Sequence, residues 1–193
     1  VDDLLTLSAL ESEQNAPVET AFAIVPLLQE LTAEARALSD GRHTIALDVG
    51  PGEDSAATIV GARDELASAF GNLVSNAVRY TPAGGTITLG WRIDEDGRGR
   101  FSVADTGIGI APEHIPRLTE RFYRVDRSRS RATGGTGLGL AIVKHVLLRH
   151  DAEIDVVSEL GKGSTFAVVL TARRVGRGEV PAAAEAAPTA TSS

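Results

Sequence analysis

Three polar side chains recur at four-residue intervals near the middle of the chain. Asn72, Asn76 and Tyr80 have this spacing, and Arg79 stands beside the last of them. Residues four apart share one face of a helix, although asparagine disfavours helix interiors. Two interpretations stay open: the amides are solvated or cap local backbone groups, or their oxygens help to hold a hard cation such as Mg²⁺, which prefers oxygen ligands and usually keeps phosphates in its shell.

The sequence Asp-Thr-Gly-Ile-Gly at 105–109 is a second candidate, because it directly follows an alternating, strand-like stretch. A plain turn would explain it, since glycine supplies positive φ and Asp105 can bond the backbone. The functional alternative is that Gly107 and Gly109 let a planar ligand approach the backbone closely. The carboxylate of Asp105 would then accept a hydrogen bond from an exocyclic amine.

A glycine-rich run at 134–140, Gly-Gly-Thr-Gly-Leu-Gly-Leu, opens a strongly apolar helix and is the third candidate. Glycines before a helix N-terminus leave backbone N–H groups that bind anions, and a merely flexible loop is the alternative. The run is not a Walker P-loop, because Gly-x4-Gly-Lys-Ser/Thr is absent. It also differs from a dinucleotide fingerprint, since its spacing is Gly-x-Gly-x-Gly and it follows a loop.

Five arginines fall within the eleven residues 121–131 of an otherwise acidic chain. A solvated basic loop is the usual explanation. Its place just before the glycine run favours a second one, in which the guanidinium groups supply positive charge to a polyphosphate. A nucleic-acid patch is less favoured, because the chain has few aromatic residues and no reader motif.

The order of these motifs resembles the ATP-binding domain of bacterial sensor histidine kinases, within the group that shares the Bergerat nucleotide fold. Residues 72–81 look like the N box, 105–109 like the G1 box, 120–126 like the F-box segment and 135–140 like the G2 box. The resemblance covers about residues 18–171. The segments 117–130 and 141–145 are especially similar to sensor kinases of the phosphate regulon of Gram-negative bacteria, which implies a role in phosphate-starvation signalling.

The resemblance implies ATP and Mg²⁺ as cofactors, and it implies a role for each matching position. Asn76 would be the metal ligand and Asn72 would support the metal and phosphates, while Arg124 would contact the γ-phosphate. These three are the candidate catalytic residues. The family pattern has a phenylalanine where this chain has Thr119, and Phe122 is the ring that could serve instead. The remaining implied nucleotide contacts are Arg79, Tyr80, Asp105, Gly107, Gly109, Tyr123, Gly135, Thr136, Gly137, Leu138 and Gly139.

One position separates the enzyme classes within this group. Related ATPases and chaperones carry a glutamate general base where this chain has Asn72, and an amide cannot act as a base. The resemblance therefore implies a protein-histidine kinase, in which positioning and charge stabilisation support phosphoryl transfer. None of the four histidines has the context of the family's phosphoacceptor, so we expect no self-phosphorylation. A nucleotide-sensing or partner-binding module without transfer activity, and a Bergerat-type ATPase, are the alternatives.

The motifs need a scaffold, and the hydrophobic pattern predicts one in which helices and strands are mixed. The resemblance implies an α/β two-layer sandwich, with a mixed sheet covered by helices on one face. Residues 106–136 read as a long loop, and long loops in compact domains are usually functional. Asp64 lies where the second helix should begin. The expected helices are 24–39, about 64–80 and 138–150, and the expected strands are 44–49, 58–60, 86–93, 100–104, 154–157 and 164–170.

Composition sets the remaining limits. The 193 residues are 42% hydrophobic, carry a net charge of −7 and include no cysteine, which excludes disulfides, thiolate zinc sites and thiol nucleophiles.

We expect residues 1–14 to be the end of a dimerisation and histidine-phosphotransfer helix, 15–171 the catalytic domain and 172–193 a disordered tail. The implied partners are that upstream domain, a response regulator and a second copy in the full-length protein. Nucleic acid is not expected. No apolar run is long enough to cross a membrane. The resemblance implies that the domain is the cytoplasmic part of a bacterial inner-membrane protein, anchored through another segment.

Overall fold

The computed structural model describes residues 18–123, 125 and 137–177. The expected helix stub at 1–14 lies outside these residues. Within them the elements are β1 (Thr20–Ala23), α2 (Ile24–Ser39), β2 (Thr44–Val49), the 3₁₀ turn η1 (Gly52–Asp54), β3 (Ala57–Gly61), α3 (Arg63–Tyr80), β4 (Thr86–Ile93), β5 (Gly99–Asp105), the 3₁₀ turn η2 (Pro112–Arg117), α5 (Gly139–Arg149), β6 (Ala152–Glu159), β7 (Gly163–Leu170), the 3₁₀ turn η3 (Ala172–Arg174) and β8 (Val175–Arg177).

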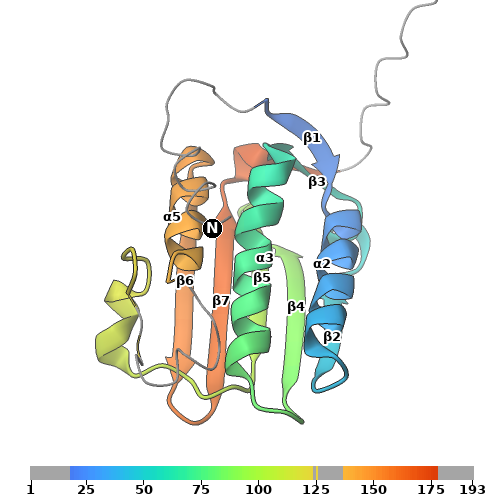
Figure 1. The fold of residues 1–193 in the computed structure, drawn as a ribbon. Coiled ribbons are helices and arrows are strands. Elements are labelled where there is room, and N and C mark those ends of the chain that lie inside the picture. Colours follow the sequence, from blue (N-terminus) through green and yellow to red (C-terminus); the bar gives the residue numbers. More distant parts are fainter. Residues whose placement is uncertain (1–17, 124, 126–136, 178–193) are drawn as a thin grey trace, which may run out of the picture.

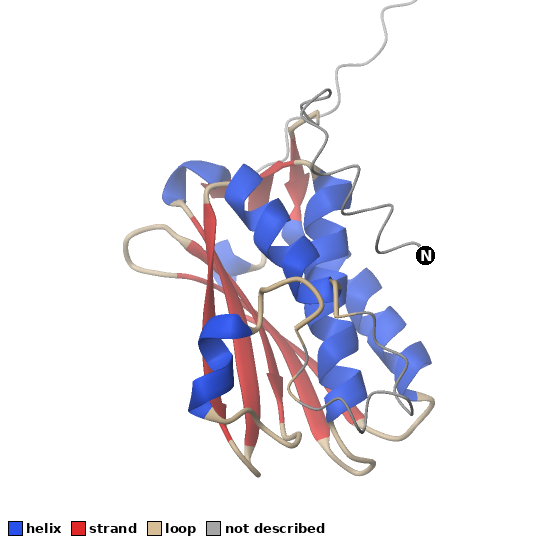
Figure 2. Ribbon diagram, turned by 60° about the vertical axis from the view of Figure 1, so that its left-hand side comes forward, coloured by secondary structure: helices blue, strands red, loops and turns tan. Residues whose placement is uncertain are grey.

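Five strands form one mixed sheet in the order β2-β4-β5-β7-β6. Strands β2 and β4 run parallel, and the other neighbours are antiparallel. In the described residues, helices α2, α3 and α5 lie side by side on one face of this sheet (Figure 1 and Figure 2). The predicted two-layer α/β sandwich is therefore confirmed.

The core fills the space between these two layers. Along β4 the buried residues Ile87, Leu89 and Trp91 alternate with more exposed neighbours, as expected for a strand with one buried face. From the helix layer, Phe70 of α3 stacks on Phe101 of β5, with ring centroids 4.2 Å apart. This packing fixes α3 against the middle of the sheet, and α3 carries the polar residues of interest.

A second, smaller sheet with the order β1-β3-β8 closes one end of the molecule. The prediction of a disordered tail from residue 172 is wrong for 172–177, because η3 and β8 continue the fold there. Val175 pairs with Ile59 of β3, and Arg174 is buried. The composition after Thr171 hid this, since a strand of three residues has no readable alternation. Strand β1 was missed for a similar reason: it is short and runs directly into α2.

The start of α3 also differs from expectation. The helix begins at Arg63 with Ala62 as its N-cap residue, and Asp64 lies in the first turn and does not cap it. The N–H of Ala62 donates to Nε2 of His150, 3.0 Å away. A side chain that is distant in sequence therefore provides the acceptor for the N–H of the N-cap residue. The region expected as a loop at 106–136 contains η2 within its described part.

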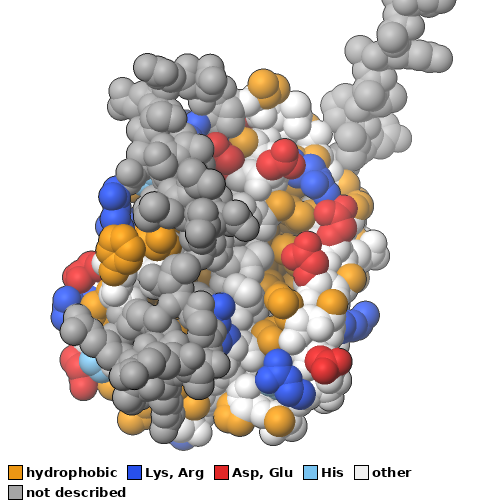
Figure 3. Space-filling view, viewed as in Figure 1, with side chains coloured by type: hydrophobic (Ala, Val, Ile, Leu, Met, Phe, Trp, Pro, Cys, Tyr) orange, Lys and Arg blue, Asp and Glu red, His pale blue; other side chains and the backbone are white. Residues whose placement is uncertain are grey.

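Charged side chains of both signs are interspersed over α2 and α3 on the face seen in Figure 3. The net charge of −7 is thus not gathered into one acidic patch there. In the described part of the chain, no helix is both long and apolar enough to span a bilayer.

Candidate functional site

The second half of α3 presents both asparagines beside its buried face. Their neighbours Leu73 and Ala77 are buried in the core, whereas Asn72 and Asn76 are half-buried. Nδ2 of Asn72 donates to the carbonyl oxygen of Ser68 at 2.9 Å, which orients the amide. The side chain of Asn76 has no hydrogen-bond partner among the described residues. Its amide therefore remains available to a ligand.

The end of α3 places Arg79 and Tyr80 at the surface. Arg79 is exposed and Tyr80 is 42% exposed. The helix ends where the N–H and the hydroxyl of Thr81 both donate to the carbonyl oxygen of Ala77. Nε2–H of His43 donates to the carbonyl oxygen of Thr81 at 2.8 Å and holds this end against the start of β2.

Asp105 ends β5 as a partly buried carboxylate. Its Oδ1 accepts the N–H of Gly107 at 2.8 Å, and it also accepts a hydrogen bond from the backbone of Ser164 on β7. Burial raises the pKa of Asp105 above its ordinary value, although these two hydrogen bonds oppose the shift. A carboxylate in such a place gains from any further hydrogen-bond donor that a ligand brings.

The protein's own backbone packs so closely on the two glycines after Asp105 that no side chain fits there. A methyl group at Gly107 would lie 2.6 Å from the carbonyl oxygen of Tyr80. Gly109 has φ of 67°, and a side chain there would collide with the backbone of Glu159. The N–H of Ile108 donates to the carbonyl oxygen of Tyr80 at 3.2 Å. Segment 105–109 is thus packed directly on the end of α3.

The first turn of α5 packs against α3 at Asn72. A methyl group at Gly139 would lie 2.6 Å from Oδ1 of Asn72, so the two helices touch where the glycine run ends. Leu138 is buried, and the carbonyl oxygen of Gly137 accepts the N–H of Phe122 at 3.0 Å. The N–H groups in the first turn of any helix lack partners within that helix, so this junction is suited to anions.

Tyr123 makes its contacts with η2. Its hydroxyl is 2.6 Å from Nδ1 of His114, and the guanidinium carbon of Arg117 lies 4.3 Å from the centre of its ring. Arg117 also pairs with Glu120 at 3.0 Å. Phe122, which the sequence offered as a substitute for a ring at position 119, is 63% exposed and has φ of 60°.

Two close contacts link described candidates from three separate segments. Asn72 of α3 meets Gly139 of α5, and Tyr80 of α3 meets Gly107 after β5. The candidates Arg124, Gly135 and Thr136 lie outside the described residues. Sequence reasoning missed the support that Ser164 gives to Asp105, which comes from the pairing of β5 with β7 and has no local signal.

This arrangement suits a nucleotide with its cation. Asn76 offers an amide oxygen, Asp105 a carboxylate for an amine, and the start of α5 backbone N–H groups for phosphates. The described residues contain no cluster of three or more His, Cys, Asp or Glu side chains that could hold a metal. A cation bound here would therefore take most of its shell from phosphate oxygens and water.

Comparison with known families gives the class of the domain. Residues 61–174, more than half of the chain, match the family described as histidine kinase-, DNA gyrase B- and HSP90-like ATPase. The chain belongs to this family, and the expected kinship is confirmed. The matched region runs from the end of β3 to the end of η3 and so includes α3, Asp105 and α5.

Two individual relatives match most of this chain. The chain is 53% identical over 167 residues to the phosphate regulon sensor protein PhoR of Pseudomonas aeruginosa, covering 86% of this chain and 37% of that protein. It is 40% identical over 172 residues to the sensor-like histidine kinase SenX3 of Mycobacterium tuberculosis, covering 89% of this chain and 41% of that protein. The chain thus spans about two fifths of the length of these relatives.

Solved structures agree in fold. The full-length histidine kinase ShkA, in complex with AMPPNP, aligns with a TM-score of 0.74 at 30% identity, over 88% of this chain and 34% of that one. The mycobacterial sensor histidine kinase MprB aligns with a TM-score of 0.67 at 25% identity, over 79% of this chain and 97% of that one.

Proposed function

We infer that this domain binds ATP with Mg²⁺ and donates the γ-phosphoryl group to a histidine on a separate helical domain. This inference rests on one side chain of α3, the amide of Asn76, which lies one turn beyond Asn72. The amide is half-buried and has no hydrogen-bond partner among the described residues. An amide in that state suits a Mg²⁺ ion that shares its shell with phosphates.

Each part of the chain then has a defined task. Asp105 accepts a hydrogen bond from the adenine amine, while Gly107 lets its segment pack against α3 and Gly109 lets it pack against the backbone of Glu159. The start of α5, at Gly137 to Gly139, binds phosphate oxygens through backbone N–H groups. Bound Mg²⁺ would offset phosphate charge. Arg79, Tyr80, Tyr123, Arg124, Gly135 and Thr136 complete the proposed nucleotide contacts.

Asn72 favours transfer over hydrolysis. Its Nδ2 donates to Ser68 and its Oδ1 faces Gly139, so the side chain braces α3 against α5. An amide cannot take a proton from water at neutral pH. With no base at this position, the acceptor must be a better nucleophile than water, such as an imidazole.

The relatives support a setting for this activity. The 53% identity to PhoR supports a sensor kinase that acts in phosphate-starvation signalling. The whole protein would then dimerise, pass phosphate from its histidine to an aspartate of a response regulator, and attach to the inner membrane through another segment. The AMPPNP bound by ShkA supports nucleotide binding at the same fold.

The test is phosphoryl transfer from labelled ATP and Mg²⁺, with calorimetry of ATP binding alongside it. The chain alone should stay unlabelled, and addition of the helical histidine domain should give an acid-labile label on that domain. Asn76→Ala should lose most Mg²⁺-dependent ATP affinity and labelling, at least about tenfold. Gln29→Ala, which removes an exposed amide from α2, is the matched control and should behave as wild type.

The other outcomes identify the alternatives. Binding of ATP without transfer to the histidine domain would point to a nucleotide-sensing module. Steady release of phosphate into water would point to an ATPase. Equal ATP affinity of wild type and Asn76→Ala would contradict the metal assignment, whatever the transfer result.

A further inference from the structure

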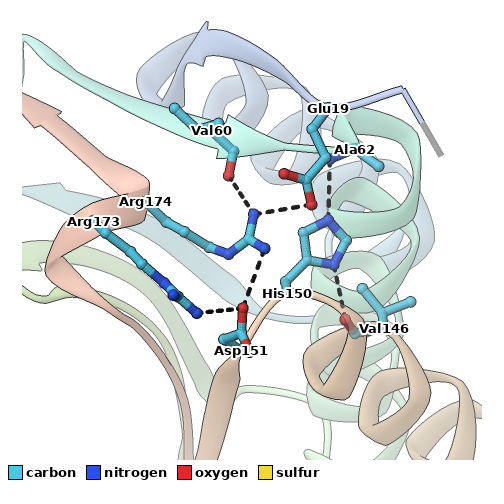
Figure 4. A network of polar contacts seen from close by, with 8 residues as sticks. All are labelled: Glu19, Val60, Ala62, Val146, His150, Asp151, Arg173 and Arg174. Carbon is cyan, nitrogen blue, oxygen red and sulfur yellow. Dashed lines mark hydrogen bonds and ion pairs between the residues drawn. The ribbon is translucent and has the colours of Figure 1, made fainter. Parts of the chain in front are cut away.

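Arg174 lies where four segments that are distant in sequence meet (Figure 4). Its Nη1 donates to Oε1 of Glu19 at 3.1 Å and to the carbonyl oxygen of Val60 at 3.0 Å, and its Nη2 donates to Oδ2 of Asp151 at 3.4 Å. The side chain is only 11% exposed. A guanidinium so far removed from water is costly unless it is paired, so these partners are needed to keep it there.

Asp151 joins two arginines in this network. It follows α5 in the left-handed conformation, with φ of 47°, which is uncommon outside glycine. Its carboxylate binds Arg173 at 2.6 Å as well as Arg174. The two ion pairs fix a backbone conformation that the chain would not favour by itself.

His150 ties the same end of α5 to the start of α3. It is completely buried. Because the N–H of Ala62 can only donate, Nε2 of His150 must accept, and Nδ1 then carries the proton that it donates to the carbonyl oxygen of Val146 at 2.8 Å. The imidazole is therefore neutral, and this tie does not depend on the ion pairs.

Helix α5 connects this network to the candidate nucleotide site. Its first residue, Gly139, touches Asn72, and Asp151 follows its last turn. The 11 residues of α5 extend about 16 Å. On the far side of the network, Glu19 immediately precedes β1, through which the chain enters the domain. A continuous set of contacts thus joins the site to the segment that leads into it.

We propose that Arg174 is a positioning residue: by binding Glu19 and Asp151 it fixes β1 to the end of α5 and so sets how the domain is held relative to whatever precedes β1. This proposal rests on the proposed function, because it matters only if the phosphoryl acceptor lies on another part of the protein. Among the described residues, the polar partners of Arg174 are Glu19, Val60 and Asp151, and none of them is a candidate nucleotide contact. Its loss should therefore slow transfer without weakening ATP binding.

The attachment of β1 can be measured directly in the 193-residue chain by hydrogen exchange. Arg174→Met and Glu19→Ala should each speed exchange of the β1 amides at least about tenfold, while exchange in β4 and β5 stays slow. Glu19 is partly exposed, so its variant should fold even if Arg174→Met does not. The control is Arg63→Met, which breaks an exposed pair with Glu30 and should leave β1 unchanged. Unchanged β1 exchange in both test variants would overturn the proposal.

Kinetics separate positioning from simple stabilisation. In the longer protein that carries the acceptor histidine, Glu19→Ala should lower kcat for transfer several-fold and leave the KM for ATP within about twofold. With the histidine domain supplied as a separate molecule, the same variant should match wild type, because β1 no longer links the partners. An unchanged kcat in the joined protein would mean that the network only stabilises β1. If wild type transfers nothing, the proposed function fails, and the exchange result still decides whether Arg174 holds β1.

Discussion

At the scale of single residues, the charge state of Asp105 is the property with the clearest consequence. Burial raises its pKa, and the N–H groups of Gly107 and Ser164 only partly offset that effect. An ionised carboxylate accepts hydrogen bonds, whereas the protonated acid offers a donor to an amine that also donates. Recognition of an adenine amine therefore depends on the ionised form.

We expect ATP affinity to fall on acidification, beginning at a higher pH than an exposed aspartate would give. The loss should follow protonation of Asp105, whose pKa burial raises above its ordinary value. Asp105→Asn should bind weakly at every pH. ATP itself takes up protons on acidification, so the ratio of the two affinities from calorimetry isolates the contribution of Asp105. A ratio that is independent of pH would contradict this role.

The same shift predicts the behaviour of stability, measured by urea unfolding. Because the folded-state pKa of Asp105 is above the unfolded one, its contribution is fully present below the unfolded pKa and is lost as pH rises through the folded pKa. Relative to wild type, Asp105→Asn should therefore have a larger free energy of unfolding, and so be more stable, at neutral pH than in acid.

At the scale of elements, the candidate site is made where the segment after β5 packs on the C-terminal end of α3 and the start of α5 packs on Asn72. Gly107 has no room for a side chain because the carbonyl group of Tyr80 lies against it. That carbonyl belongs to a helix end fixed by Thr81 and His43, so it cannot move away easily. The close approach holds Asp105 at a fixed position relative to Asn76.

Gly107→Ala should therefore cost about 1–3 kcal/mol of unfolding free energy and weaken ATP binding. Gly84→Ala is the matched control, because Gly84 has φ of 87° with open space around it. That change should cost about 1–2 kcal/mol from backbone strain alone and leave ATP affinity intact. Urea unfolding and calorimetry measure both effects. Equal ATP affinity of Gly107→Ala and wild type would show that the contact does not shape the site.

At the scale of the whole molecule, the small sheet decides where the domain ends. Strand β8 extends β3 through three residue pairs, and Arg174 sits buried just before it. The boundary expected from composition, residue 171, therefore cuts through ordered structure. Residues 178–193 lie outside the described part, and their expected disorder remains a prediction.

Two truncations test this boundary. A chain that ends at residue 171 should lose about 3 kcal/mol or more of unfolding free energy, because it loses Arg174 and the edge of the small sheet. A chain that ends at residue 177 should stay within about 0.5 kcal/mol of the full sequence. Urea unfolding provides the comparison. Equal stability of the two truncated chains would show that β8 adds nothing.

The sequence predicted what depends on local pattern. The spacing of Leu66, Phe70 and Leu73 predicted α3, and alternation predicted β4 and most of the other strands of the large sheet. It also predicted the shared helix face of Asn72 and Asn76, since both lie on one continuous helix. Such features follow from residues a few positions apart, whose relative places are fixed by backbone geometry.

The tertiary structure alone decided what depends on distant contacts. It paired β8 with β3 and placed Ser164 beside Asp105. It also joined Glu19 to Arg174 across 155 positions of sequence. No local pattern encodes these contacts, because they arise only when the burial of whole layers brings the ends of separate elements together. The sequence by itself determined the chemical groups and the helix that carries the two asparagines, and the packing of the layers determined which groups meet.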